Sequence, residues 1–279
     1  MSLPFFQIDS FTSEAFSGNP AAVILLDKQR SNEWLQLVAM ENNLSETAFV
    51  LPSTNAQTWP LRWFTPTIEV DLCGHATLAA AHALWESETV PCDQPILFET
   101  RSGPLTVKKL GNHIQMDFPI TPVTKTAAPK GLIESLQING QRPSITEVLK
   151  SAFDYMVVVH DEATVRNLTV DFRQLAQVDA RGAIVTAIAD PTSDYDFVSR
   201  FFGPAAGVDE DPVTGSAHCA LIDYFSQKRK RNQLTGYQAS ARGGIVEVEK
   251  RDDRAILSGE AVTVIRGQLF TPPRPDFAA

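Results

Sequence analysis

Two segments of this 279-residue chain follow one plan, and each ends in a glycine where a helix is expected to begin. The first covers residues 62–77 and reads RWFTP, then DLCGHAT; the second covers residues 200–217 and reads RFFGP, then DPVTGSA. Gly74 and Gly215 lie 141 positions apart, and the same offset carries Gly103 and its strand onto Gly244 and its strand. A shared offset in separate segments indicates a duplicated unit.

A duplicated unit that faces itself across a pseudo-twofold axis would bring two helix N-termini, at Gly74 and Gly215, into one cleft. Each helix start offers free backbone N–H groups and the positive end of a helix dipole. We therefore expect a site for a small anion, or for negative charge that develops during a reaction.

The composition restricts the partners of the protein. The chain is 43% apolar and 20% charged, with a formal net charge of −9, which argues against binding to a nucleic-acid backbone. No apolar run approaches the roughly 20 residues that span a bilayer, and the N-terminus lacks the pattern of a secretory signal. The three cysteines, Cys73, Cys92 and Cys219, are odd in number and irregular in spacing, so we expect no disulfides and a cytoplasmic protein.

The expected fold class is α/β (α+β), with two similar domains related by pseudo-twofold symmetry. The helices opened by Gly74 and Gly215 are apolar around most of their circumference, so each should be enclosed by short strands as a central helix in a barrel-like sheet. A Pro- and Thr-rich passage at 119–129 reads as a linker. We divide the chain at residues 1–121 and 130–279 and allow the C-terminal tail to return to the first domain. The tail after Phe270 is expected to be irregular.

Local patterns predict the first elements of the chain. Strands are expected at 5–11, 21–26 and 47–51, and a helix at 32–41 with Ser31 as its N-cap.

One carboxylate stands out because the repeat does not duplicate it. Glu46 lies at the mouth of a strand, and the matching strand at 181–185 carries Arg181 at that position. A carboxylate present in one half only is typical of a single general base, although a loop glutamate exposed to solvent is the alternative.

His75 and Asp211 flank the two glycine turns from opposite halves. His75 could orient or protonate a substrate, because imidazole titrates near neutral pH, or it could be a polar residue in the first turn of its helix. Asp211 could act on a substrate, or it could stabilise the turn before Pro212 or cap the helix. Ser216 could bind a substrate carboxylate or satisfy its own helix end.

Cys73 directly precedes Gly74 and could serve as an acid/base thiol if the helix N-terminus lowers its pKa. The second half has no cysteine at the corresponding place, so a symmetric two-thiol mechanism is not supported. A zinc site is conceivable on ligand type, but the spacings do not match the usual structural sites, so no metal is expected; its ligands would be Cys73, His75, His218 and Cys219.

Taken together, these segments resemble the phenazine-biosynthesis PhzF-like family, within the diaminopimelate-epimerase-like fold. The resemblance rests on four stretches, at residues 11–23, 45–50, 64–77 and 210–217. It implies two domains, each a β-barrel-like sheet around a central helix, with the active site between them, and a cofactor-free isomerase that is often a homodimer. It assigns proton transfer to Glu46, places His75 and Asp211 beside it, and makes substrate-binding residues of Gly74, Gly215 and Ser216.

The chain departs from the cysteine-dependent relatives of this fold, because Cys73 matches their first thiol and the second is missing. Three readings of the function remain. The leading one is an isomerase that shifts a proton on a small carboxylate-bearing metabolite, with Glu46 as general base and acid. The others are an epimerase or racemase that uses Cys73, and a regulatory protein that binds a ligand without catalysis.

Overall fold

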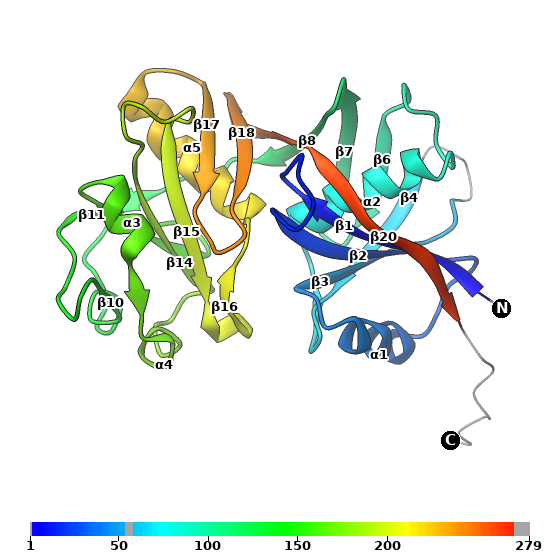
Figure 1. Ribbon diagram of the computed structural model, residues 1–279, viewed down its shortest axis with the longest axis horizontal. Helices are drawn as coiled ribbons and strands as arrows, with labels where there is room; N and C mark the ends of the chain where they lie inside the picture. Colours follow the sequence, from blue (N-terminus) through cyan, green and yellow to red (C-terminus); the bar gives the residue numbers. More distant parts are fainter. Residues whose placement is uncertain (1, 54–57, 271–279) are drawn as a thin grey trace.

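The computed structural model describes residues 2–53 and 58–270, which form two lobes side by side (Figure 1). The expected tail after Phe270 lies outside the described residues. The first lobe contains helices α1 (Asn32–Asn42) and α2 (Gly74–Glu86). Its strands are β1 (Ser2–Ser10), β2 (Asn19–Leu25), β3 (Glu46–Val50), β4 (Thr58–Phe64), β5 (Glu69–Val70), β6 (Ile96–Thr100), β7 (Gly103–Leu110) and β8 (His113–Pro119).

The second lobe holds helices α3 (Glu162–Asn167), α4 (Phe172–Leu175) and α5 (Gly215–Arg229), with a single 3-10 turn at Pro204–Ala206. Its strands are β9 (Thr124–Lys125), β10 (Leu136–Gln137), β11 (Ile145–Lys150), β12 (Asp154–Val159), β13 (Thr169–Val170), β14 (Gly182–Ile188), β15 (Phe197–Gly203), β16 (Val208–Asp211), β17 (Gln233–Gln238), β18 (Gly244–Arg251) and β19 (Arg254–Gly259). The last strand, β20 (Ala261–Phe270), leaves this lobe and runs antiparallel to β1 in the first.

The pairing pattern of the strands confirms the duplication. In the first lobe β1–β2 is antiparallel, β2–β3 parallel, β3–β4 antiparallel, β4–β6 parallel, and β6–β7–β8 antiparallel. The same series recurs in the second lobe as β11–β12, β12–β14, β14–β15, β15–β17 and β17–β18–β19. The two α+β lobes are therefore built on one plan, as the repeat predicts.

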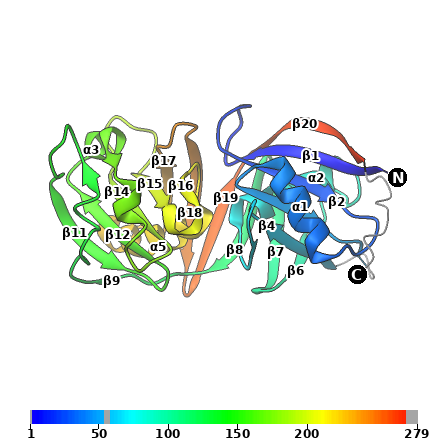
Figure 2. The same ribbon diagram turned by 90° about the horizontal axis from the view of Figure 1, so that it is seen from below.

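The equivalent strands β8 and β19 pair with each other in antiparallel register, from Arg254 opposite Pro119 to Gly259 opposite Ile114. This pair joins the sheets of the two lobes at the pseudo-twofold axis, and Figure 2 shows β19 between them. The 119–129 passage connects the lobes, but it is more ordered than a free linker. Ile120 N–H donates to Asp253 O, and β9 pairs with β11, because extended Pro- and Thr-rich chain can add to a strand edge. The division at 1–121 and 130–279 is kept as a proposal.

Each lobe wraps its sheet around one central helix. Helix α2 has 11 buried residues, and α5 also has 11. Each helix packs against strands of its own lobe, as expected, and because the two helices meet at their N-termini their side chains also join one continuous hydrophobic core. Smaller cores lie under α3 and α4 and under α1.

The predicted elements near the N-terminus are confirmed, with bounds that differ from the structure by at most three residues. At the start of α1 the Ser31 side chain accepts a hydrogen bond from Trp34 N–H, as expected of an N-cap. Phe11 does not extend β1, because its φ of 63° turns the chain away from the strand. Within the part of the chain that the structure describes, no helix is long and apolar enough to cross a membrane.

Candidate active site

The two glycine turns face each other at the centre of the molecule. A Cβ atom added to Gly74 would lie 3.4 Å from the Cα atom of Gly215, and the reverse substitution gives the same distance. Neither helix has a side chain that caps its N-terminus: the N-cap residues are Cys73 and Thr214, and no side-chain cap bond is formed at either. The first N–H groups of both helices are therefore free to bind an anion.

A cavity of about 590 Å³ opens in front of these helix ends. This volume falls within the range of small-molecule pockets. The cavity brings together all the site residues predicted from the sequence, which come from both lobes: Glu46, Cys73, Gly74, His75, Asp211, Gly215 and Ser216.

Glu46 is the first residue of β3, and its side chain is only 16% exposed. Burial, and to a smaller extent the negative charge of Asp211, raise the pKa of Glu46 to about 8. The alternative of a solvated loop glutamate is wrong. A carboxyl group with this pKa exchanges its proton near neutral pH, as a general acid and base must.

Asp211 ends β16 and is held in place from both lobes. Its Oδ1 atom accepts a 2.7 Å hydrogen bond from Asn19 Nδ2, and its Oδ2 atom accepts one of 2.5 Å from Thr214 Oγ1. Burial raises the pKa of Asp211 to about 6, despite these hydrogen bonds. Asp211 does stabilise the turn, but it does not cap α5, and it also lines the cavity.

His75 is 3% exposed, and burial lowers its pKa to about 3, so the imidazole is neutral. The expectation that this ring titrates near neutral pH is wrong, because a buried imidazolium would lose its hydration. Nδ1 lies 3.5 Å from Cys73 Sγ, which can donate, and 3.2 Å from Asn19 Nδ2, an amide nitrogen that cannot accept a hydrogen bond. We therefore place the ring hydrogen on Nε2.

The Nε2 atom of His75 lies 3.2 Å from Glu46 Oε2, but the contact is not aligned as a hydrogen bond, and Nε2 has no other partner in the described chain. A buried N–H without a partner is costly, so this atom is suited to a hydrogen bond with a bound molecule.

Cys73 is 7% exposed. Burial, and secondly the charge of Glu46, raise the pKa of its thiol well above the ordinary value. The conditional expectation of a thiol activated by the helix N-terminus is not met, because loss of hydration outweighs the helix dipole.

The conceivable zinc ligands do not converge. His218 is fully buried, its Nδ1 atom contacts Thr214 O at 2.8 Å, and it does not line the cavity. Among the described residues, the group with metal-ligating atoms close together is Glu46, Cys73 and His75, within 4.8 Å of one another. Two of the three, Glu46 and Cys73, would have to lose a proton that burial holds in place, so the group is poorly suited to hold a metal ion.

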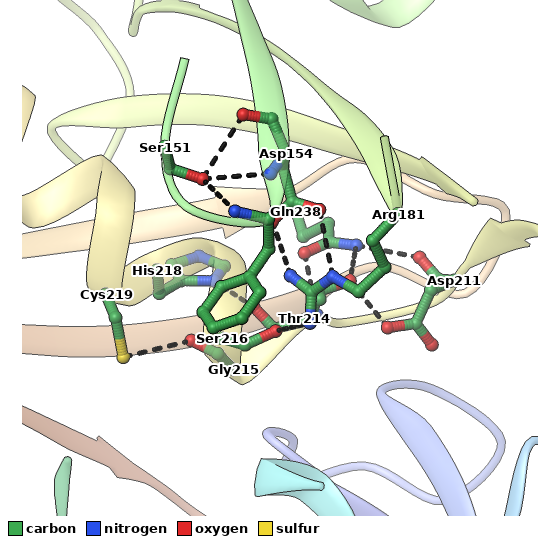
Figure 3. Close-up of polar contacts among 11 residues, drawn as sticks. Ser151, Asp154, Arg181, Asp211, Thr214, Gly215, Ser216, His218, Cys219 and Gln238 are labelled. Carbon is green, nitrogen blue, oxygen red and sulfur yellow. Dashed lines mark hydrogen bonds and ion pairs between the residues drawn. The ribbon is translucent and has the colours of Figure 1, made fainter. Parts of the chain in front are cut away.

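Sequence reasoning missed two residues of the site. Asn19 is fully buried, contacts His75 and Asp211, and also donates a 2.9 Å hydrogen bond to Val213 O. Arg181 lines the cavity and donates a 3.0 Å hydrogen bond from Nη1 to Ser216 Oγ (Figure 3). The repeat placed Arg181 at the position that matches Glu46, and this could have indicated that Arg181 belongs to the site, but we did not predict it there. Asn19 lies in the 11–23 stretch that carries the family resemblance, but the resemblance gave it no role in the site.

A family model described as phenazine biosynthesis-like protein matches residues 8–267. The chain belongs to this family. An uncharacterized isomerase from Halalkalibacterium halodurans is 48% identical, over 97% of this chain and 99% of that protein. A second, from Pseudomonas aeruginosa, is 46% identical, over 96% of this chain and 99% of its own length.

A solved PhzF family structure from Enterococcus faecalis is 39% identical, covers 97% of this chain and 100% of its own, and superimposes with a TM-score of 0.89. A hydroxyproline epimerase from Agrobacterium vitis shares the fold. It superimposes with a TM-score of 0.64 over 96% of this chain and 91% of its own, at 9% sequence identity. The predicted family and fold are thus confirmed, and the protein is an isomerase of the PhzF family.

Proposed function

We propose that the protein is a cofactor-independent isomerase that shifts a proton on a small carboxylate-bearing metabolite, with Glu46 as the general base and then the general acid. The observation that carries this proposal is the position of Glu46. It is a desolvated carboxyl group with a pKa of about 8 that the repeat does not duplicate, and it shares a cavity with two uncapped helix N-termini.

In the proposed reaction the Glu46 carboxylate removes a proton from a carbon next to the activating group of the substrate. The C–H electron pair moves into the conjugated system, and negative charge develops on oxygen. The free N–H groups at Gly74 and Gly215 face that charge and stabilise it. Glu46 then returns the same proton to another carbon, so that atoms and charge balance without an external oxidant or reductant.

The neighbouring groups support these steps. The charge of Asp211 raises the pKa of Glu46 further, because two carboxylates in one buried site resist being ionised together, and this makes the ionised Glu46 a stronger base. His75 is neutral, so we assign it a hydrogen bond from Nε2–H to the substrate rather than proton delivery.

The test is incorporation of deuterium from D2O into a panel of small unsaturated and cyclic carboxylic acids, followed by NMR. The wild-type protein should label at least one acid, and Glu46→Gln should lose labelling by about a hundredfold or more. Glu249→Gln, at a surface glutamate that is paired with Arg251, is the matched control and should label normally. Labelling retained by Glu46→Gln would remove Glu46 from the mechanism.

The same experiment distinguishes the two other readings. A regulatory protein would bind an acid and label none. An epimerase that depends on Cys73 would lose labelling in Cys73→Ser as severely as in Glu46→Gln, which the raised pKa of the thiol argues against.

A further inference from the structure

Arg181 occupies in the second lobe the place that Glu46 occupies in the first. Glu46 is the first residue of β3, which lies parallel to β2; Arg181 directly precedes β14, which lies parallel to β12. The Arg181 N–H continues that pairing by donating to Phe153 O at 2.9 Å. Because the lobes face each other, both side chains line the same cavity.

The guanidinium group of Arg181 is fixed on three sides, by Asp154 and by two aromatic rings. Its Nε donates to Asp154 Oδ1 at 2.9 Å, and its Nη2 pairs with Asp154 Oδ2. Asp154 is 2% exposed. The Phe153 and Phe201 rings each lie with their centroid 5.4 Å from the Cζ atom of Arg181. A guanidinium held by a two-point carboxylate contact and two aromatic rings has little freedom to turn.

The remaining contact of this guanidinium is with Ser216. Nη1 donates to Ser216 Oγ at 3.0 Å, so the hydroxyl acts as acceptor toward Arg181. The hydroxyl hydrogen must then point elsewhere, and no acceptor for it is found in the parts of the chain that the structure describes. Ser216 lines the cavity beside the free N–H groups of α5, so its O–H adds a further donor there.

We propose that Arg181 is a positioning residue that holds Ser216 as a hydrogen-bond donor, so that this end of the cavity accepts a carboxylate and discriminates against neutral analogues. The inference rests on the proposed function, since it concerns the carboxylate expected at the helix ends. It deepens that function by naming the groups that favour an acid over a neutral molecule. These are the Ser216 hydroxyl and the free N–H groups of α5, which we call the carboxylate corner, next to Arg181, which keeps its charge at every physiological pH.

The charges of the cavity support this role. Among the described residues that line it, Arg181 is the only lysine or arginine. Asp211, with a pKa of about 6, carries a negative charge near neutral pH, so a carboxylate is bound most favourably where Arg181 offsets that charge.

The experiment measures binding without turnover, with benzoate as the carboxylate probe and benzamide as its neutral analogue, by ligand-observed NMR titration. Wild-type protein should bind benzoate at least about tenfold more tightly than benzamide, which corresponds to one charge-assisted hydrogen bond. Ser216→Ala and Arg181→Met should each reduce benzoate affinity about tenfold and leave benzamide unchanged. The double variant should bind benzoate no more weakly than either single variant, since the two residues act through one contact.

Two further variants protect the test against a general loss of folding. Arg181→Lys keeps a charge beside Asp154 but cannot reach Asp154 and Ser216 together, so it should lose the preference for benzoate while remaining folded. Arg200→Met is the matched control. Arg200 forms a similar two-point pair with Glu210, at 2.7 and 2.9 Å, stacks on Phe202, and does not line the cavity.

The outcomes separate this inference from the proposed function. Equal affinity of the wild type for benzoate and benzamide, or an equal loss in Arg200→Met, would overturn the role of Arg181. Additive losses in the double variant would do the same. Glu46→Gln should bind benzoate as well as the wild type does. A failed labelling experiment would therefore contradict the proposed function without contradicting the role of Arg181 and Ser216 in carboxylate binding.

Discussion

Asn19 in the first lobe and Asp211 in the second are joined by a 2.7 Å hydrogen bond, from Asn19 Nδ2 to Asp211 Oδ1. The turn that carries Asn19 is itself held by the second lobe, because Arg242 donates to Ser17 O and Gly18 O at 2.8 Å each. Gly18 has a φ of 63°, and a Cβ atom there would lie 2.2 Å from Ser10 O, so only glycine fits this turn. The candidate active site is thus assembled across the two lobes.

We expect Asn19→Ala to reduce kcat in the labelling reaction by about tenfold to a hundredfold, with KM changed little. The substitution removes the donor that fixes Asp211 and the amide beside His75 Nδ1, so both groups gain freedom. Asn42→Ala, which removes a 3.1 Å hydrogen bond to Thr47 Oγ1 at a part-buried position, is the control. If both variants lose activity equally, the bridge between Asn19 and Asp211 has no special role.

Glu46→Gln should change the pH dependence of stability. The folded-state pKa of Glu46, about 8, lies above the unfolded value of 4.5, so the folded protein binds more protons between these pH values. Wild-type stability from this group is therefore fully present below pH 4.5 and is lost as pH rises through 8. Near pH 9 the Gln variant should be the more stable by a few kcal/mol, since one pKa unit corresponds to about 1.4 kcal/mol.

Urea denaturation of both proteins near pH 5 and near pH 9 measures this difference. Glu249→Gln provides a control of opposite sign, because a hydrogen bond from Arg251 lowers the pKa of Glu249. Its carboxylate contributes stability above the unfolded pKa, and that stability is lost as the pH falls. Parallel stability curves for wild type and Glu46→Gln would show that Glu46 is not desolvated.

The sequence predicted what depends on repeated or local pattern. The meeting of Gly74 and Gly215 followed from one offset in two helix-start motifs, and the Ser31 cap followed from residues within four positions. It did not predict contacts that depend on how the lobes pack. Asn19 and Asp211 are 192 positions apart, and no periodicity indicates which buried polar groups will pair.

Charge states were predicted only where burial could be anticipated. Two duplicated lobes that close over Glu46 would remove its carboxyl group from water, so the repeat itself predicts the raised pKa of this group. The neutral state of His75 and the protonated thiol of Cys73 were not predicted, because both depend on how completely the helix end is enclosed. The guanidinium of Arg181 was seen as a mismatch in the repeat, while its contact with Ser216 required the folded chain.

Cys73→Ser should be mild, reducing kcat by less than about tenfold, because the protonated thiol contacts the reacting groups without transferring the proton. Alkylation by iodoacetamide offers a second measurement. Cys92 is exposed and should react readily, whereas Cys73 and Cys219 are buried and should react slowly. In a Cys92→Ser background the reagent should leave activity intact. A loss as large as that of Glu46→Gln would favour the Cys73 epimerase reading.

Activity should survive exhaustive treatment with a strong chelator, because a carboxyl group and two helix N-termini supply both the proton transfer and the stabilisation of charge. Elemental analysis before and after treatment measures the metal content alongside the labelling rate. A zinc enzyme treated in parallel verifies that the chelator is effective. Stoichiometric zinc whose removal stops the reaction would instead assign the group of Glu46, Cys73 and His75 to a metal.

The contact between Gly74 and Gly215 makes a prediction about paired substitutions. Each single alanine would place its Cβ atom 3.4 Å from the opposite Cα atom, which is ordinary van der Waals contact, so Gly74→Ala and Gly215→Ala should both fold. The double variant would put two methyl groups into the same gap. Its loss of stability should exceed the sum of the single losses by about 1 to 3 kcal/mol, the coupling expected of residues in direct contact.

Gly267→Ala is the matched control for the double variant. Nothing lies within 4 Å of an added Cβ atom there, so this change should add its own small effect independently to either single variant. Urea midpoints of the set give the coupling energy, and NMR titration with benzoate reports whether each single methyl group blocks the anion site. Additive effects of Gly74→Ala and Gly215→Ala would mean that the two helix ends do not face each other. That result would contradict the proposed binding of one anion by the N–H groups of both helices.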